Sequence, residues 1–218
     1  MLKYKCLVLD HDDTVVQSEA TVNYPYFCQL LDQLRPGTTI TLQEYTDGCY
    51  YQGFVQMCKT RFQFTDKEMD IEYLGWKEYM KSHPPKPFEG IRELLQLQRE
   101  NGGLICVVSH STKETILRDY QLQFQMMPDE VFGWDLPEHQ RKPNTYPIMQ
   151  IMEKYSLTPA DLLVIDDMKT GWEMANKANV KIVFAAWGRQ NNPDLISEMS
   201  GLCDLHFDQV KDLTNFLF

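Results

Sequence analysis

Four short apolar segments constrain the fold of this 218-residue chain more than any other feature of its sequence. They are residues 6–9, 104–108, 162–165 and 182–185, and a weaker candidate lies near Val131. Continuous apolar runs of this length are typical of strands that are buried on both faces of a parallel sheet. Helical patterns separate the later segments. The sequence therefore predicts an α/β fold with a doubly wound, mostly parallel Rossmann-like sheet.

Helix start signals support this alternation. Ser111 and Glu114 form a capping-box pattern, which predicts that a helix begins there after the second strand. Thr158 followed by Pro159 predicts a short helix before the next strand. Apolar residues recur at helical spacing from residue 88 onward, until two glycines end the pattern at residues 102 and 103.

The interval from residue 16 to residue 87 breaks the alternation. It is rich in aromatic residues, carries capping-box patterns beginning at Thr41 and Thr65, and has no convincing buried strand. A proline-rich run at residues 84–87 closes it as a stiff connector, because each proline fixes its own φ and restricts its predecessor. We therefore expect an α-helical domain over residues 16–87, inserted into an α/β core formed by residues 1–15 and 88–218.

The acidic composition limits the possible partners. A net charge of −10 and a pI of about 4.9 argue against nucleic acid and against an anionic membrane surface. The six cysteines form no CxxC pair, so we expect free thiols in a reducing compartment. The sequence lacks a run of the roughly 18 apolar residues that a spanning helix needs. The expected location is the cytoplasm, and the oligomeric state, monomer or homodimer, stays open.

Polar side chains follow the predicted strands at the points where those strands end. In a doubly wound fold, ligands bind outside the carboxyl ends of the strands, so these side chains should converge on one edge of the sheet. They are Asp10, Asp12 and Thr14 after the first strand, Ser109 after the second, Lys142 after the candidate near Val131, and Asp166 and Asp167 after the fourth.

Four carboxylates gathered at one edge require a compensating charge. Two unit charges about 4 Å apart repel by about 4 kcal/mol even at an effective dielectric constant near 20. Either some of the carboxyl groups are protonated or a hard dication joins them. Mg²⁺ fits because it takes oxygen ligands and keeps positions open for water and a phosphate oxygen. With Lys142 as a second positive group, this arrangement suits phosphoryl transfer.

In this order, the same residues resemble the four motifs of the haloacid dehalogenase-like hydrolases. The motifs are Asp10-x-Asp12-x-Thr14 after an apolar strand, Ser109, Lys142-Pro143, and Asp166-Asp167. The resemblance spans the chain, and the segment inserted after the first motif is similar to that family's helical C1 cap. Within the family, this cap type is typical of the group of phosphoglycolate phosphatase and β-phosphoglucomutase.

The resemblance implies a role for each motif residue. Asp10 would attack phosphorus and form an aspartyl-phosphate. Asp12 would protonate the leaving oxygen and then activate water, and its backbone carbonyl would bind the metal. The implied Mg²⁺ ligands are Asp10, Asp12, Asp166 and Asp167, and the implied phosphate contacts are Thr14, Ser109, His110 and Lys142. The predicted function is Mg²⁺-dependent hydrolysis of a small phosphorylated metabolite.

Two alternatives remain open. A sugar-phosphate mutase of the β-phosphoglucomutase type would share the core and cap, but those enzymes carry a histidine ten residues after the acid/base aspartate, where this chain has Val22. A phosphoryl-binding regulatory protein without turnover would not need Asp12.

The sequence disfavours two other classes of protein. A receiver-type signalling domain spaces its acidic residues differently and lacks a large insertion. A dehalogenase acting on carbon needs neither Asp12 nor the metal carboxylates.

Several residues near the motifs have no assigned role. His11 could touch the substrate or be structural, and Asp13 could be solvated or cap a turn. Arg189, in the run Trp187-Gly188-Arg189 after the last predicted strand, could form a surface salt bridge or be functional. The substrate itself is not predicted, because the residues of the inserted segment would select it.

Overall fold

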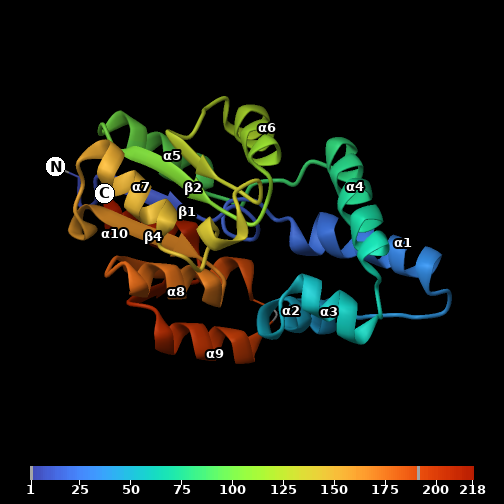
Figure 1. Ribbon diagram of the computed structural model, residues 1–218. Helices are drawn as coiled ribbons and strands as arrows, with labels where there is room; N and C mark the ends of the chain where they lie inside the picture. The colour runs from blue at the N-terminus through green and yellow to red at the C-terminus, as the bar shows by residue number, and fades with distance from the viewer. Residues whose placement is uncertain (1, 191) are drawn as a thin grey trace. The chain divides into compact units, whose positions relative to one another are not determined.

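The computed structural model describes residues 2–190 and 192–218, and the chain divides into two compact units. One unit is the helical segment Ser18–Pro85. The other is formed by the residues before and after that segment and contains the sheet (Figure 1).

Within the described residues, six parallel strands form one sheet in the order β3-β2-β1-β4-β5-β6. They are β1 (Cys6–Leu9), β2 (Leu104–Val108), β3 (Glu130–Phe132), β4 (Leu162–Asp166), β5 (Lys181–Ala185) and β6 (Leu205–Phe207). The predicted α/β fold with a parallel sheet is confirmed, and the four apolar segments match β1, β2, β4 and β5 to within one residue. The candidate near Val131 is β3. Strand β6 is not predicted by the sequence pattern, because exposed His206 interrupts its short apolar run.

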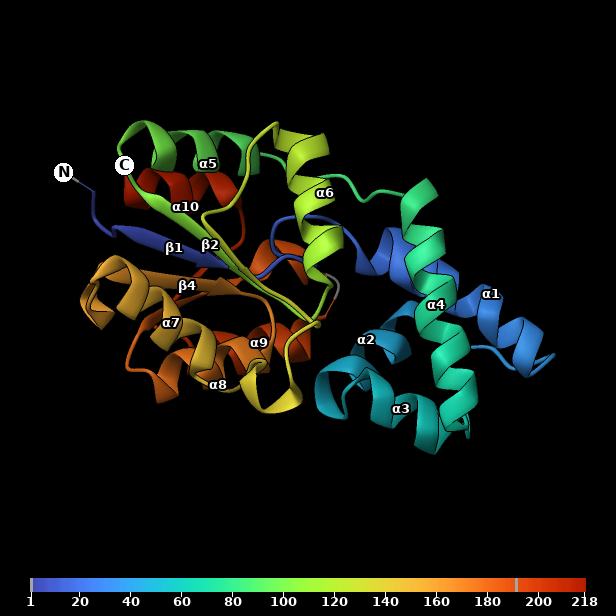
Figure 2. The same cartoon turned by 45° about the horizontal axis from the view of Figure 1, so that its top comes forward.

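Helices cover both faces of the sheet. They are α5 (Ile91–Glu100), α6 (Lys113–Phe124), α7 (Tyr146–Tyr155), α8 (Lys169–Lys177), α9 (Pro193–Leu202) and α10 (Val210–Leu217), with 3-10 turns at Glu138–Gln140, Pro159–Asp161 and Ala186–Gly188. Leu7 and Leu9 of β1 point to the face packed by α5, α6 and α10, whereas Cys6 and Val8 point to the face packed by α7 and α8. Figure 2 shows α5 and α10 on one side of the strands and α7 and α8 on the other. Burial on both faces explains why these strands are apolar throughout.

One predicted helix start is wrong and one is confirmed. Helix α6 begins at Lys113 with Thr112 as its N-cap, and the Thr112 side chain accepts a hydrogen bond from the Thr115 amide. The predicted capping box at Ser111 does not form, because the Ser111 hydroxyl donates to Asp12 instead. The predicted short helix after Thr158 is the 3-10 turn Pro159–Asp161.

The helical unit is held together by an aromatic core. Its elements are a π-helical turn (Glu19–Asn23), α1 (Tyr24–Leu34), α2 (Leu42–Tyr51), α3 (Phe54–Arg61) and α4 (Asp66–Ser82). The ring of Phe27 lies 5.3–5.8 Å from those of Tyr45, Phe54 and Phe62, measured between centroids. The capping boxes predicted at Thr41 and Thr65 both form and begin α2 and α4.

Two sequence expectations concern the whole chain. The six cysteines are free thiols, as expected. Across the described ranges, every helix is too short or too polar to span a membrane.

Candidate active site

The turn after β1 brings Asp10 to the carboxyl edge of the sheet. The Asp10 amide donates to the Ile165 carbonyl at 2.9 Å, so the pairing of β1 with β4 extends one residue beyond Leu9. The chain then reverses. The amides of Val15 and Val16 both donate to the His11 carbonyl, and Asp13 adopts a left-handed conformation with φ of 55°. This tight turn places the Asp10 side chain beside the end of β4.

Three carboxylates and one ammonium meet there. The ligand oxygens of Asp10, Asp166 and Asp167 lie within 4.8 Å of one another. Lys142 Nζ lies 2.5 Å from Asp10 Oδ1 and 2.9 Å from Asp166 Oδ2. All four residues are buried. A Cβ atom at Gly171, in the first turn of α8, would lie 2.1 Å from the Asp166 carboxyl carbon, so glycine leaves the room that this carboxylate occupies.

The electrostatics of this cluster are unbalanced. Burial raises the pKa of Asp10 well above its ordinary value; Lys142 opposes that shift, and the charges of Asp166 and Asp167 add to it. Burial also raises the pKa of Asp166. For Lys142, burial lowers the pKa, but attraction to Asp10 and Asp166 outweighs this and raises it above the ordinary value. Lys142 therefore stays an ammonium, and its single charge does not compensate the carboxylates fully.

Asp12 is oriented by two serines after β2. Ser111 Oγ donates to Asp12 Oδ2 at 2.6 Å, and Ser109 Oγ reaches the same oxygen at 3.4 Å. The Ser111 amide donates to Ser109 Oγ at 3.1 Å, which fixes the two hydroxyls relative to each other. Asp12 Oδ1 is buried and has no hydrogen-bond partner among the described residues.

Asp167 is held on both of its oxygens. Thr14 Oγ1 donates to Asp167 Oδ1 at 3.1 Å. The guanidinium of Arg189 contacts Asp167 Oδ2 through Nε at 2.6 Å and through Nη2 at 2.5 Å. The hydroxyl proton of Thr14 is therefore directed to a carboxylate, and the predicted contact of Thr14 with phosphate stays a prediction.

The model of the haloacid dehalogenase-like hydrolases matches residues 7–185 of the chain. The chain belongs to this family. A haloacid dehalogenase-like hydrolase domain-containing protein of Arabidopsis thaliana, At4g39970, is 25% identical over 163 residues, which are 72% of this chain and 51% of that protein. The chain thus spans about half the length of this curated relative.

Solved structures share the fold of this hydrolase over nearly its whole length. A predicted phosphoglycolate phosphatase from Haemophilus somnus superposes with a TM-score of 0.81 at 17% identity, covering 99% of both chains. A candidate phosphoglycolate phosphatase from Lactobacillus plantarum has a TM-score of 0.74 at 21% identity, covering 99% of this chain and 100% of its own. A family hydrolase from Deinococcus radiodurans, solved with bound phosphate and sodium, has a TM-score of 0.75 at 16% identity and covers 99% and 98%.

The cluster in this hydrolase fits a divalent metal ion. Carboxylate oxygens are the ligands that hard dications prefer, and three buried carboxylates already lie close enough to share one. Burial, together with the charges of Asp166 and Asp167, raises the pKa of Asp10 although Lys142 lies beside it, and a bound cation would favour the ionised carboxylate. The Asp12 carboxylate is not among the three that form this cluster, and the predicted ligand from Asp12 is its backbone carbonyl.

The two histidines beside the motifs lie outside this cluster. His11 is fully buried, and its Nε2 lies 3.1 Å from Asp119 Oδ2 of α6. Its ring also stacks on Tyr120, so its contacts are structural. His110 Nε2 donates to the Lys142 carbonyl at 3.0 Å, and its ring meets the edge of Trp134. His110 thus supports the Lys142 loop, and its predicted contact with phosphate stays a prediction.

Two residues of the site have roles that the sequence does not predict, Ser111 and Arg189. Ser111 stands two residues after Ser109, and this spacing is the only local signal of its contact with Asp12. Arg189 is only 6% exposed, so it is not a surface residue. Its partner Asp167 lies 22 residues away, at the end of another strand, and no local pattern connects the two.

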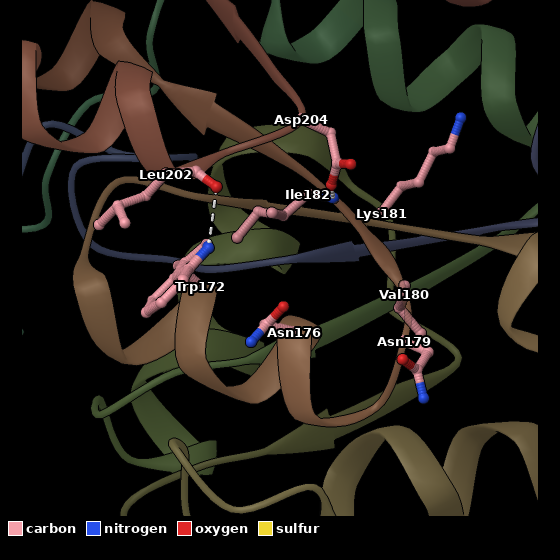
Figure 3. Close-up of a pocket in the computed structure, with 8 residues that line it drawn as sticks. All are labelled: Trp172, Asn176, Asn179, Val180, Lys181, Ile182, Leu202 and Asp204. Carbon is pink, nitrogen blue, oxygen red and sulfur yellow. Dashed lines mark hydrogen bonds between the residues drawn. The ribbon is translucent and has the colours of Figure 1, made fainter.

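A separate cavity of about 250 Å³ lies at the amino end of β5, at the opposite end of the sheet from the carboxylates (Figure 3). The indole of Trp172 and the side chains of Asn176 and Lys181 line it. The Trp172 Nε1 atom donates to the Leu202 carbonyl at 2.9 Å, which ties α8 to the end of α9. The one carboxylate in its lining, Asp204, accepts a hydrogen bond from the Ile182 amide at 2.9 Å, so the clustered carboxylates described above lie only at the carboxyl edge.

Proposed function

We propose that this hydrolase is a Mg²⁺-dependent phosphatase that releases phosphate from a small phosphorylated metabolite through an aspartyl-phosphate on Asp10. The observation that carries the proposal is the position of Asp10. Its carboxylate is buried 2.5 Å from the Lys142 ammonium, beside Asp166 and Asp167, and two residues before Asp12. A carboxylate nucleophile divides the hydrolysis of a phosphate ester into two easier steps. The bound phosphate in the Deinococcus radiodurans relative agrees with this chemistry.

In the first step, an oxygen of Asp10 attacks phosphorus, and the ester oxygen leaves with the electron pair of its bond. Asp12 gives its proton to that leaving oxygen. In the second step, Asp12 takes a proton from water, and the water oxygen attacks phosphorus. The bond between phosphorus and Asp10 then breaks, which releases phosphate and restores the Asp10 carboxylate. One proton leaves Asp12 and one returns, so the cycle balances.

The serines define which oxygen of Asp12 exchanges the proton. Ser111 and Ser109 occupy Oδ2, whereas Oδ1 keeps its capacity for a proton. Holding one oxygen of a catalytic carboxyl group fixes the direction of proton transfer from the other.

Lys142 opposes protonation of the nucleophile. Burial and the neighbouring carboxylates favour the protonated form of Asp10, which would not attack phosphorus, and the Lys142 ammonium opposes this. Asp10, Asp166 and Asp167 would hold Mg²⁺, with the backbone carbonyl of Asp12. When bound, the ion would supply further positive charge for the nucleophile and for the phosphoryl oxygens.

Two features favour hydrolysis over mutase chemistry and over binding alone. Val22 stands where the mutases carry their histidine, and its side chain is buried and apolar, so it can neither give nor take a proton. The hydrogen bonds to Asp12 orient an acid/base group that a mere phosphate receptor would not need. The role of the helical unit as a cap that selects the leaving group stays a prediction of the family resemblance.

The test is phosphate release from a panel of phosphorylated metabolites, with Mg²⁺ and with EDTA. We expect turnover that EDTA abolishes and that Asp10→Asn abolishes without loss of secondary structure. Asp194→Asn, which changes an exposed aspartate in the first turn of α9, is the matched control and should stay active. Activity retained in Asp10→Asn, or full activity in EDTA, would refute the mechanism. Conversion of a hexose 1-phosphate to its 6-phosphate would favour the mutase instead.

A further inference from the structure

The loop after β5 contacts the turn after β1 through three consecutive residues. Trp187 Nε1 donates to the Thr14 carbonyl at 2.9 Å. Gly188 packs so closely that a Cβ atom there would lie 1.9 Å from the Asp13 carbonyl oxygen, which only glycine avoids. Arg189 then turns inward to Asp167. This loop therefore has a fixed position relative to the candidate metal ligands.

Arg189 contacts the carboxylates at a side of the cluster that Lys142 does not reach. Its Nε and Nη2 both contact Asp167 Oδ2, and Nη2 lies 3.8 Å from Asp13 Oδ2. The contacts of Lys142 are instead with Asp10 and Asp166. In these contacts Lys142 lies on Asp10 and Asp166, and Arg189 lies on Asp167 and near Asp13.

The two cations also differ in what else they can do. Lys142 lies on the nucleophile and would meet the phosphoryl group, whereas Arg189 lies on a candidate metal ligand. A buried carboxylate without a partner is strongly destabilising, so Asp167 needs a cation whether or not a metal ion is bound. A planar guanidinium meets this need well, because its fork holds a carboxylate oxygen in a defined direction.

We infer that Arg189 is a positioning residue that holds the Asp167 carboxylate in place before the metal ion binds. The guanidinium supplies part of the positive charge that the ion would otherwise have to supply, so the metal-free site is preformed and the fold depends less on the ion. The inference rests on the proposed function only in taking Asp167 as part of the metal site.

The test is the thermal stability of Arg189→Met in EDTA and in a titration with Mg²⁺. In EDTA we expect a melting temperature lower than that of the unchanged protein by about 5 °C or more, because Asp167 loses its partner in a buried site. Mg²⁺ should recover much of this loss, because the ion replaces the missing charge. The rise in melting temperature with Mg²⁺ should therefore be larger in Arg189→Met than in the unchanged protein.

A purely structural ion pair would behave differently, and the chain offers one as a control. Arg99 contacts Asp129 at 2.6 Å, and Asp129 accepts from the Ile105 amide at the amino end of β2, far along the strand from the carboxylates. Arg99→Met should lose the same stability with and without Mg²⁺. If the melting temperature of Arg189→Met is also lowered by the same amount in EDTA and in Mg²⁺, the inference is overturned.

Two more variants keep the test decisive. If Arg189→Met does not fold, Arg189→Lys keeps the charge without the fork, and its Mg²⁺ response should still exceed that of the unchanged protein. In EDTA, adding Asp167→Asn to Arg189→Met should restore stability, because the unpaired charge is gone; no restoration would contradict the inference.

Phosphate release is measured separately, so that failure of the proposed function and failure of this inference can be told apart. A protein without turnover that still shows the larger Mg²⁺ response in Arg189→Met would refute the phosphatase and support this inference. The absence of any Mg²⁺ response in both proteins would overturn it.

Discussion

Glu72 of α4 should make the stability of this protein depend on pH. Its side chain is buried in the helical unit, and burial raises its pKa from 4.5 to about 7. The difference between these two values corresponds to about 3 kcal/mol. Below pH 4.5 the carboxyl group is protonated in both the folded and the unfolded protein, so its burial carries no charge penalty. As the pH rises, the unfolded chain ionises first, and the penalty is complete above about pH 7.

The variant Glu72→Gln separates this charge effect from packing, because glutamine has nearly the shape of a protonated glutamate. We expect its free energy of unfolding to exceed that of the unchanged protein by about 3 kcal/mol at pH 8 and by less than about 1 kcal/mol at pH 5. Urea denaturation followed by far-ultraviolet circular dichroism at both pH values measures the difference.

The same helix provides a matched control. Glu78 is exposed and pairs with Lys81 at 2.8 Å, so Glu78→Gln should change the free energy of unfolding by less than about 1 kcal/mol at either pH. If Glu72→Gln changes the free energy of unfolding by the same amount at pH 5 and pH 8, the change does not come from ionisation of the buried carboxyl group. No effect at pH 8 would refute the reasoning altogether.

Two predictions concern the active site. Ser111→Ala should lower kcat by roughly tenfold or more, because a hydrogen bond to a charged group contributes about 1.5–3 kcal/mol. Ser82→Ala, on an exposed helix end, is the control and should leave kcat unchanged. Steady-state phosphate release compares the two variants. A KM change without a kcat change would contradict the role of Ser111 in orienting Asp12. Lys142→Met should reduce phosphate release by about a hundredfold or more and should also lower the melting temperature, because two buried carboxylates lose their shared ammonium. Unchanged turnover would show that Lys142 does not serve the nucleophile.

The strands were predictable because a parallel sheet leaves a local trace. The side chains on both faces of β1 and β2 are buried, so each strand must be apolar along its length, and a short window of sequence reveals this. The edge strand β6 has only three residues with an exposed histidine between them, and its pairing with β5 depends on a partner that no window contains. The start of α6 was misplaced for a related reason. Ser111 fits a local capping pattern, but Asp12, 99 residues away, takes its hydroxyl.

The motif residues of the site were predictable from order and strand position. Parallel strands end at the same edge, so Asp10 and Asp166 had to approach each other once β1 and β4 paired. The sequence also required a cation, because clustered carboxylates repel whatever their exact spacing. It could not assign hydrogen-bond partners, since these depend on side-chain directions set by packing. Thr14 is an example, because its hydroxyl donates to Asp167.

The sequence by itself determined the class of sheet, the set of acidic and basic groups at its carboxyl edge, and the kind of chemistry that such a set can perform. These follow from periodicity and charge, which are local properties of the chain. Only the tertiary structure decided which cation serves which carboxylate. Lys142 lies against Asp10 and Asp166, and Arg189 lies against Asp167, because loops from different strands fold onto one edge. The energies of buried charges depend on distances of a few ångströms, and those distances exist only after folding.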